Sequence, residues 1–93
     1  MTLLSIEETR MNLQDLPGWE AQGGTLVKTF AVRSFVHGVI LIGAIAQLAE
    51  AAGHHPDLNL HSYSKLTVTL ATHSEGGVTI KDVLLAQQID RLP

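Results

Sequence analysis

Five histidines are the side chains of this sequence best suited to chemistry, and four of them fall between positions 54 and 73. His54 and His55 follow a predicted helix end, and His73 follows the end of a predicted strand. Because rigid elements deliver the side chains at their ends to a shared edge, these three could meet at one site. Imidazole exchanges protons near neutral pH, which makes it a common general acid or base. The pattern therefore indicates a site for proton transfer.

Two carboxylates stand at separations that would let them support these histidines. Glu50 lies four residues before His54, a spacing that places both side chains on one face of a helix. Asp82 is the third residue after Thr79 in a helix-capping pattern, so a structural role would explain it equally well. His54 or His55 could likewise be a helix cap or a solvated turn residue. Chemical and structural interpretations both stand at this point.

Composition excludes or disfavours other kinds of site. The chain has no cysteine, which rules out disulfides, thiolate nucleophiles and cysteine-based metal sites. Three histidines and a carboxylate could bind zinc, but no two histidines stand four residues apart on a predicted helix, so we expect no metal. The Gly-x-Ser-x-Gly motif of serine hydrolases is also absent from the sequence.

Length and charge indicate one soluble domain over residues 1–93. The chain is 45% hydrophobic and 16% charged with a net charge of -3, which excludes intrinsic disorder and argues against nucleic acid as a direct ligand. Its start carries Glu7 and Glu8 and no basic run, unlike a secretory signal. The apolar stretch Gly38–Ala46 is shorter than the ~20 residues that span a bilayer. We therefore expect a cytoplasmic protein without a membrane partner.

Helix caps and turn residues divide the chain into elements in the order α-β-β-α-β-β-α. Helices are predicted from Ser5 to Pro17, from Ser34 to about Ala52 and from Thr79 onward, and strands at Trp19–Ala21, Leu26–Val32, Leu58–Tyr63 and Lys65–Thr72. Leu66, Val68 and Leu70 alternate with polar residues, which is typical of an antiparallel strand with one buried face. The order predicts an α+β fold, with a single layer of helices on a four-stranded antiparallel sheet.

The predicted helices differ in how much of their surface is apolar. The last helix is expected to turn inward the four apolar side chains Ile80, Val83, Leu84 and Ile89. The central helix is apolar around most of its circumference, so it should be buried against the sheet, a partner or both. A domain of this length also buries only about two-thirds of the surface of its unfolded chain. We therefore expect the central helix to serve in a dimer.

The candidate site residues form an ordered series along the chain. The series is Glu50, His54-His55-Pro56, Tyr63, His73 and Asp82. Flanking blocks that belong with it are Leu16–Trp19, Phe30 with Val32 and Phe35, Ala49–Pro56, Thr72–Thr79 and Leu85–Asp90. Together they resemble the pterin-4a-carbinolamine dehydratases over nearly the whole chain from about Leu16. A lone His-His-Pro run would be a weak signal, whereas this ordered set is specific.

The resemblance implies a fold, an activity and an assembly. The family fold is a four-stranded antiparallel sheet with helices on one face, which agrees with the predicted element order. Its activity is the dehydration of 4a-hydroxytetrahydropterin, the product left by aromatic amino acid hydroxylases, to quinonoid dihydropterin and water in tetrahydrobiopterin recycling. The resemblance implies a small pterin substrate, no metal or organic cofactor, and a homodimer or a dimer of dimers.

The resemblance also implies roles for individual residues. His54 and His73 would form the general acid/base pair, since the hydroxyl group must leave protonated and a ring nitrogen must lose a proton. His55 would orient the pterin or assist proton transfer, and Glu50 would tune or hold His54. Asp82 matches the closing aspartate of the family, for which orientation of a site group and helix capping carry equal weight. Pro56 completes the histidine block as a substrate-binding or supporting residue.

Two positions depart from the family pattern. Six residues separate Pro56 from Tyr63, where many members have five. This spacing predicts a β-bulge near His61 and Ser62 that returns Tyr63 to the core. Ser74 stands where many members have an acidic residue, which weakens the match next to His73.

A second function is consistent with the same resemblance. Some proteins similar to this family act as dimerisation partners of a transcription factor, and others resemble assembly chaperones that have lost activity. A scaffold of this kind needs no convergent imidazoles. The intact His54, His55 and His73 therefore favour the enzyme over the scaffold.

Overall fold

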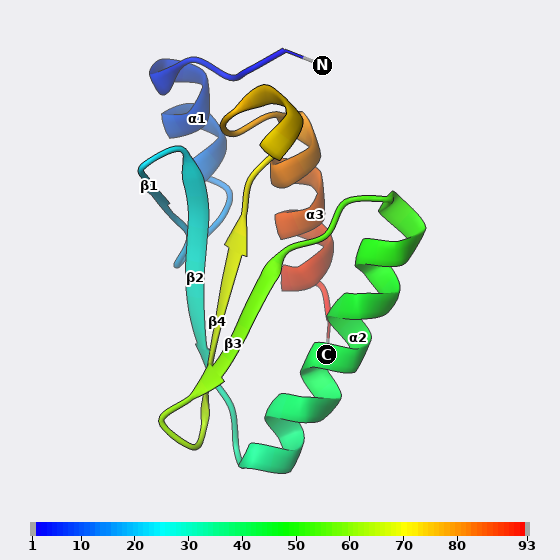
Figure 1. Cartoon of the computed structure of the whole chain (residues 1–93). Helices are drawn as coiled ribbons and strands as arrows, with labels where there is room; N and C mark the ends of the chain where they lie inside the picture. Colours follow the sequence, from blue (N-terminus) through cyan, green and yellow to red (C-terminus); the bar gives the residue numbers. More distant parts are fainter. Residues whose placement is uncertain (1, 93) are drawn as a thin grey trace.

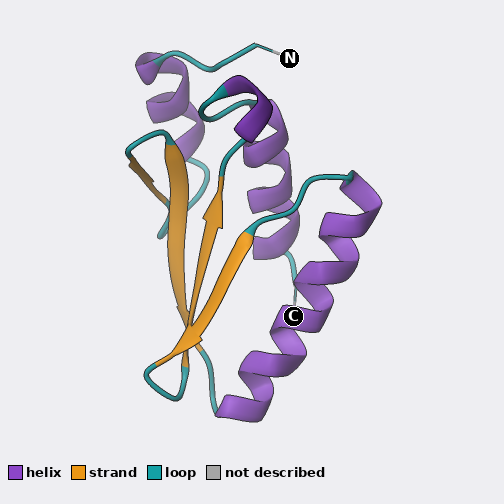
Figure 2. Ribbon diagram, viewed as in Figure 1, coloured by secondary structure: helices purple, strands orange, loops and turns teal. Residues whose placement is uncertain are grey.

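Three α-helices and a four-stranded antiparallel sheet make up the computed structural model, which describes residues 2–92 (Figure 1). The elements are α1 (Ile6–Leu13), β1 (Glu20–Gln22), β2 (Thr25–Ala31), α2 (Phe35–Ala52), β3 (Asp57–His61), β4 (Lys65–Leu70), a short 3₁₀ helix η1 (His73–Glu75) and α3 (Ile80–Asp90). The strand order is β1-β2-β4-β3, with every neighbouring pair antiparallel. Figure 2 shows α2 and α3 side by side along the sheet. The predicted α+β class and element order are confirmed.

Polar side chains cap the three α-helices where the sequence predicts. At α1, the Glu8 N–H donates to Ser5 Oγ at 3.0 Å, and the Ser5 N–H donates to the Glu8 carboxylate at 2.8 Å. Ser34 caps α2, and Thr79 with Asp82 forms a second reciprocal box at α3. Each cap satisfies backbone donors that a helix N-terminus otherwise leaves free, so local sequence sets the helix starts.

A left-handed glycine ends α2 and redirects the chain. Gly53 has a φ of 62°, a conformation that glycine adopts without the steric cost of a Cβ atom. Its N–H donates to the Glu50 carbonyl oxygen at 3.2 Å, and the His54 N–H donates to the Ala49 carbonyl oxygen at 3.1 Å. These bonds fix the direction in which His54 and His55 leave the helix.

β4 supplies the centre of the hydrophobic core. Leu66, Val68 and Leu70 are completely buried, which confirms the predicted inward face of this strand. The other buried members of the core are Leu16, Trp19, Leu26, Ile45, Val78, Val83, Leu85, Ala86 and Ile89. Burial of a Val or Leu side chain contributes about 1.5–3 kcal/mol, so these three side chains contribute substantially to the packing of the helices on the sheet.

The inward face of α3 differs in part from the predicted one. Val83 and Ile89 are buried as expected, but Ile80 and Leu84 are 40% and 50% exposed. The buried stripe instead includes Asp82, Leu85, Ala86 and Ile89. Their separations of three, one and three residues place them on one side of a helix. A polar residue begins this stripe, which a search for apolar periodicity could not include.

The predicted bulge that would return Tyr63 to the core is wrong. β3 ends at His61, which pairs with Lys65 across the sheet, so the residues between them make the chain reversal. Ser62 and Tyr63 have positive φ values of 51° and 71°, and the Ser64 N–H donates to the Ser62 carbonyl oxygen at 2.8 Å. Tyr63 is 69% exposed at this tip. The alternation of side chains along a strand does not extend into such a turn. A prediction based on that alternation therefore wrongly places the Tyr63 ring in the core.

α2 packs one side on the protein and leaves the other open. Gly38, Ile45 and Ala49 are buried, whereas Val36 and Ile40 are 64% and 62% exposed. By length and composition alone α2 could cross a membrane, but interior helices of soluble proteins meet the same criterion. The single chain therefore leaves a large apolar helix face uncovered.

Candidate active site

A buried hydrogen bond joins His54 to Asp82. His54 Nε2 lies 2.5 Å from Asp82 Oδ1. His54 is 9% exposed and Asp82 is completely buried. The C-terminal cap of α2 delivers the imidazole, and the first turn of α3 delivers the carboxylate. This contact links the end of α2 to the first turn of α3. It also gives the buried charge of Asp82 a partner, and an unpaired buried charge would be costly.

Two buried threonines complete the hydrogen bonding of Asp82. The Thr72 hydroxyl donates to Asp82 Oδ2 at 2.9 Å, and the Thr79 N–H donates to the same oxygen at 2.9 Å. The two threonine hydroxyl oxygens lie 2.7 Å apart. Asp82 therefore caps α3 and hydrogen-bonds His54 at the same time.

Glu50 contacts His55 rather than His54. His55 Nε2 lies 2.5 Å from Glu50 Oε2, and these side chains are 63% and 76% exposed. The expected contact between Glu50 and His54 is absent from the described hydrogen bonds because the left-handed Gly53 ends the helical rotation before His54. Pro56 follows, half-buried, and restricts the backbone of His55 to an extended conformation.

His73 lies at the start of η1, one residue after Thr72 in the chain. The Thr72 carbonyl oxygen accepts three backbone N–H groups of this turn, two at 3.0 Å and one at 3.4 Å. His73 therefore follows in the chain the residue whose hydroxyl bonds Asp82. The His73 side chain is exposed, and within residues 2–92 no hydrogen bond joins it to the other candidate histidines.

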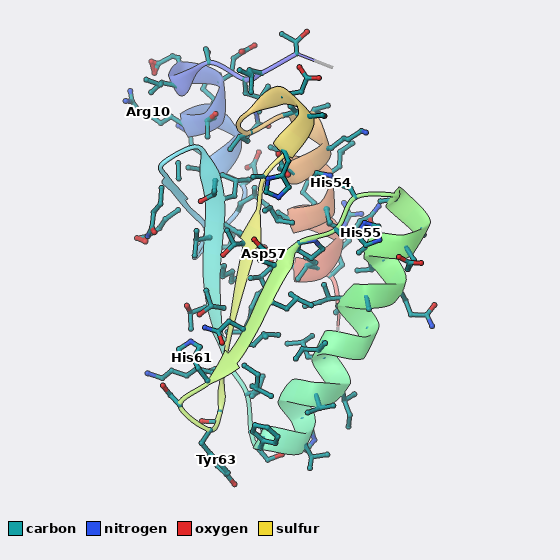
Figure 3. The ribbon with its side chains drawn as sticks, viewed as in Figure 1. Arg10, His54, His55, Asp57, His61 and Tyr63 are labelled. Carbon is teal, nitrogen blue, oxygen red and sulfur yellow. The ribbon has the colours of Figure 1, made fainter. Side chains whose placement is uncertain are left out.

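The remaining histidines lie elsewhere. Figure 3 labels His54 and His55 where α2 passes into β3, and His61 with Tyr63 at the opposite end of the β3–β4 hairpin. His61 Nε2 is 2.8 Å from Thr67 Oγ1 on the neighbouring strand. His37 lies in the first turn of α2. The structure therefore separates these two residues from the candidate site.

Two pockets lie apart from the candidate histidines. The larger, of about 670 Å³, is bounded by the N-terminal segment, α1, the β1–β2 hairpin and residues 76–78. The smaller, of about 480 Å³, lies between the start of α2 and Leu92. Neither is lined by His54, His55 or His73. In the described part of the chain, no group of three or more His, Asp or Glu side chains is arranged to hold a metal ion.

Sequence reasoning did not include Thr72 and Thr79 among the site residues. The sequence identifies Thr79 as a helix cap and Thr72 as the neighbour of His73. Neither pattern shows that the two hydroxyls contact each other beside the Asp82 carboxylate. That meeting depends on how β4, η1 and α3 are placed relative to one another.

The arrangement is suited to proton transfer. A carboxylate that binds one ring nitrogen of an imidazole fixes the orientation of the ring. The second ring nitrogen can then gain or lose a proton in contact with a ligand. His54 has this form of support from a buried Asp82, and His55 has it from an exposed Glu50.

Related sequences align with this chain over nearly its whole length. It is 44% identical over 90 residues to a protein of Nocardia farcinica provisionally named pterin-4-alpha-carbinolamine dehydratase, with 97% of this chain and 94% of that protein covered. A protein of Roseiflexus sp. with the same provisional name is 46% identical over 91 residues, with 98% and 97% covered. The sequence profile of the family described as pterin 4 alpha carbinolamine dehydratase matches residues 2–92.

Two solved structures share the fold. A crystal structure described as transcriptional coactivator/pterin dehydratase from Brucella melitensis superposes with a TM-score of 0.89 at 31% identity, covering 96% of each chain. A pterin dehydratase-like protein identified as a RuBisCO assembly factor in the alpha-carboxysome gives a TM-score of 0.66 at 26% identity, covering 78% of this chain and 86% of that one. With the profile match over nearly its whole length, this chain belongs to the pterin-4-alpha-carbinolamine dehydratase family.

Proposed function

We propose that this protein dehydrates 4a-hydroxytetrahydropterin to quinonoid dihydropterin and water by histidine acid/base catalysis. Family membership supports the substrate class. The buried pair of His54 and Asp82 is the observation that carries the proposal, because it is an imidazole held in place for proton transfer. An aromatic amino acid hydroxylase would supply the substrate in the cytoplasm, and a reductase would return the product to tetrahydrobiopterin.

The reaction needs one proton delivered and one removed. The bond between C4a and the hydroxyl oxygen breaks, and the oxygen keeps the electron pair and takes a proton from an acid, so that water leaves. A base removes a proton from a ring nitrogen, and the freed electron pair forms the new carbon–nitrogen double bond. No net oxidation occurs, so the reaction itself requires no redox cofactor. Two imidazoles near the pterin are sufficient for both transfers.

In this proposal His54 and His73 are the acid/base pair. Asp82 supports His54 from the protein interior. His73, the first residue of η1, follows Thr72 in the chain and is the second group of the proposed pair. His55 orients the pterin with support from Glu50, since the two are already hydrogen-bonded at the surface. Pro56 keeps the chain extended after His55.

The experiment follows dehydration of a synthetic pterin carbinolamine by stopped-flow absorbance with the purified protein. The wild type is expected to accelerate the reaction clearly above the buffer rate. His73→Ala should lower kcat by about 100-fold, which is a usual contribution of a positioned acid or base. His61→Ala is the matched control, because His61 bonds Thr67 at the far end of the hairpin, and should keep wild-type kcat. A wild-type rate equal to buffer would reject the enzymatic function.

The open face of α2 favours a second candidate function as a partner-binding module. Phe35, Val36, Val39 and Ile40 are each about half exposed or more, which is unusual for an apolar cluster on a monomer. The relative identified as an assembly factor acts through a related fold. We propose that the partner bound by α2 is a second copy of this chain, which makes the protein a homodimer. If the wild type leaves the dehydration rate unchanged, partner binding becomes the leading function.

A further inference from the structure

The direction of each hydrogen bond around Asp82 can be assigned by counting protons. Thr72 has one hydroxyl proton, and it is donated to Asp82 Oδ2 at 2.9 Å. The contact of 2.7 Å between the two threonine hydroxyls must then use the proton of Thr79. Thr79 Oγ1 in turn accepts the Lys81 N–H at 3.3 Å. The hydrogen bonds therefore run in one direction, from the α3 backbone through Thr79 and Thr72 to Asp82.

The same count shows which ring nitrogen of His54 carries the proton. Asp82 Oδ2 accepts two hydrogen bonds, from the Thr72 hydroxyl and the Thr79 N–H. A carboxylate held by these donors is an acceptor only, so at Oδ1 the proton must come from His54 Nε2. The neutral ring therefore keeps its hydrogen on Nε2, and Nδ1 is the atom left to gain or lose a proton.

Thr72 is the member of this network that also belongs to the His73 segment. Its N–H donates to the Gly77 carbonyl oxygen at 2.9 Å, and its own carbonyl oxygen accepts the N–H groups of the turn that carries His73. Its side chain is buried, with only 4% of the residue exposed. One residue thus holds Asp82 through its hydroxyl and the His73 turn through its backbone.

We propose that Thr72 is a positioning residue whose hydroxyl orients Asp82 toward the Nε2–H of His54, so that His54 exchanges protons through Nδ1. Its catalytic consequence rests on the proposed dehydratase function. The position of the His54 proton does not depend on that function, because it follows from the hydrogen bonds of the free protein.

The test compares Thr72→Val, which removes the hydroxyl at nearly constant volume, with Thr72→Ser, which keeps it. Thr69→Val is the matched control, because Thr69 lies on β4 but faces away from the buried Leu66, Val68 and Leu70. Nitrogen NMR of the full chain labelled in its histidine rings reports which nitrogen of His54 carries the proton, with His54→Gln assigning the signal. Stopped-flow kinetics on the pterin carbinolamine give kcat and KM, and thermal unfolding reports folding.

The wild type is expected to show His54 as Nε2–H. Thr72→Val should keep the proton on Nε2, because Asp82 still only accepts, but should shift the Nε2 signal as its hydrogen bond loosens and lower kcat by about tenfold with little change in KM, as expected for a lost hydrogen bond to a charged group. Thr72→Ser should restore both, and Thr69→Val should match the wild type.

Three results would overturn the inference. The first is a wild-type His54 with its proton mainly on Nδ1, which decides the matter even if Thr72→Val fails to fold. The second is a Thr72→Val protein with wild-type spectrum and kcat. The third is a Thr72→Ser protein as impaired as Thr72→Val, which would indicate packing rather than the hydroxyl. If the wild type lacks dehydratase activity, the proposed function fails while the nitrogen spectra still test the placement of the proton.

Discussion

Asp82 shows how one residue can serve both the fold and the site. It is the only charged member of the buried stripe on α3, and its two oxygens are divided between two tasks. Oδ2 accepts the Thr79 N–H and so caps the helix, while Oδ1 binds His54. Capping the helix therefore also places the carboxylate that supports the imidazole.

Asp82→Asn should damage both tasks. The amide NH₂ group must face either the Thr72 and Thr79 donors or the His54 Nε2–H. In both orientations two hydrogen-bond donors face each other where water cannot reach them. We expect kcat for pterin dehydration to fall by about 100-fold or more, since the imidazole loses its acceptor. The free energy of unfolding should fall by about 1–3 kcal/mol in denaturant titration.

Asp57→Asn provides the control for this substitution, because Asp57 is exposed at the start of β3. It should leave kcat and stability close to wild type. An Asp82→Asn protein with wild-type kcat would contradict the role assigned to this carboxylate.

Among the secondary-structure elements, those with local start and stop signals were predictable from the sequence. The reciprocal cap of Ser5 and Glu8, the cap at Ser34 and the left-handed Gly53 each satisfy backbone groups within a few residues. The Gln22–Thr25 turn joins β1 to β2 as the Gly-Gly sequence predicts.

Features that depend on contacts distant in sequence were not predictable. The pairing of His54 with Asp82 rather than Glu50 requires α2 and α3 to meet, and no local pattern contains that information. Tyr63 was misplaced because the length of the chain reversal, and not strand alternation, decides its direction. The catalytic roles of the histidines remain predictions that rest on the family resemblance.

Two glycines within α2 offer a matched test of how this helix packs. A Cβ added at Gly38 would lie 2.6 Å from Leu60 Cδ1 on β3, whereas one added at Gly43 would meet nothing within 4 Å. Gly38→Ala should therefore destabilise the fold by about 1–3 kcal/mol through overpacking. Gly43→Ala should stabilise it by up to about 1 kcal/mol through helix propensity. Chemical denaturation of both variants measures the difference, and equal effects would contradict the packing of α2 on β3.

A polar contact between β2 and α3 should contribute to stability but not to catalysis. Asp90 accepts hydrogen bonds from Trp19 Nε1 and from Lys28 Nζ, each at 3.0 Å. Asp90→Ala leaves the buried Trp19 and the partly buried Lys28 without their shared acceptor, so the free energy of unfolding should fall by about 1–3 kcal/mol while kcat is unchanged. The control is Glu7→Ala, which breaks the exposed pair with Arg10 and should change stability little. Equal losses in the two variants would show that the Asp90 cluster contributes no more than a surface ion pair.

At the scale of the whole molecule, one layer of helices on one sheet gives a thin core. Because α2 and α3 lie side by side on the sheet, only one side of α2 can be buried by its own chain. The opposite side keeps Val36, Val39 and Ile40 exposed. A small domain with so much open apolar surface gains stability when a second copy covers it.

The proposed homodimer can be tested by placing a charge on α2. Light scattering of the wild type at micromolar concentration should give the mass of a dimer or a dimer of dimers. Ile40→Glu should weaken association by at least about tenfold, because burying a charge without a partner is costly. Ile6→Glu is the control, since Ile6 is 81% exposed on α1 and should leave the mass unchanged. A monomeric wild type would count against the dimer.

The central claim is that His54 and His73 act together on a pterin. A crystal structure of the protein with a bound dihydropterin tests it most directly, because it shows which side chains adjoin the reacting carbon. The account predicts that the C4a position lies between the two imidazoles, with His54 Nε2 still bonded to Asp82 and with a ring nitrogen of each histidine within about 3–4 Å of C4a or its neighbouring nitrogen. A pterin bound instead in the pocket beside α1 and the β1–β2 hairpin, with neither ring in contact, would contradict it.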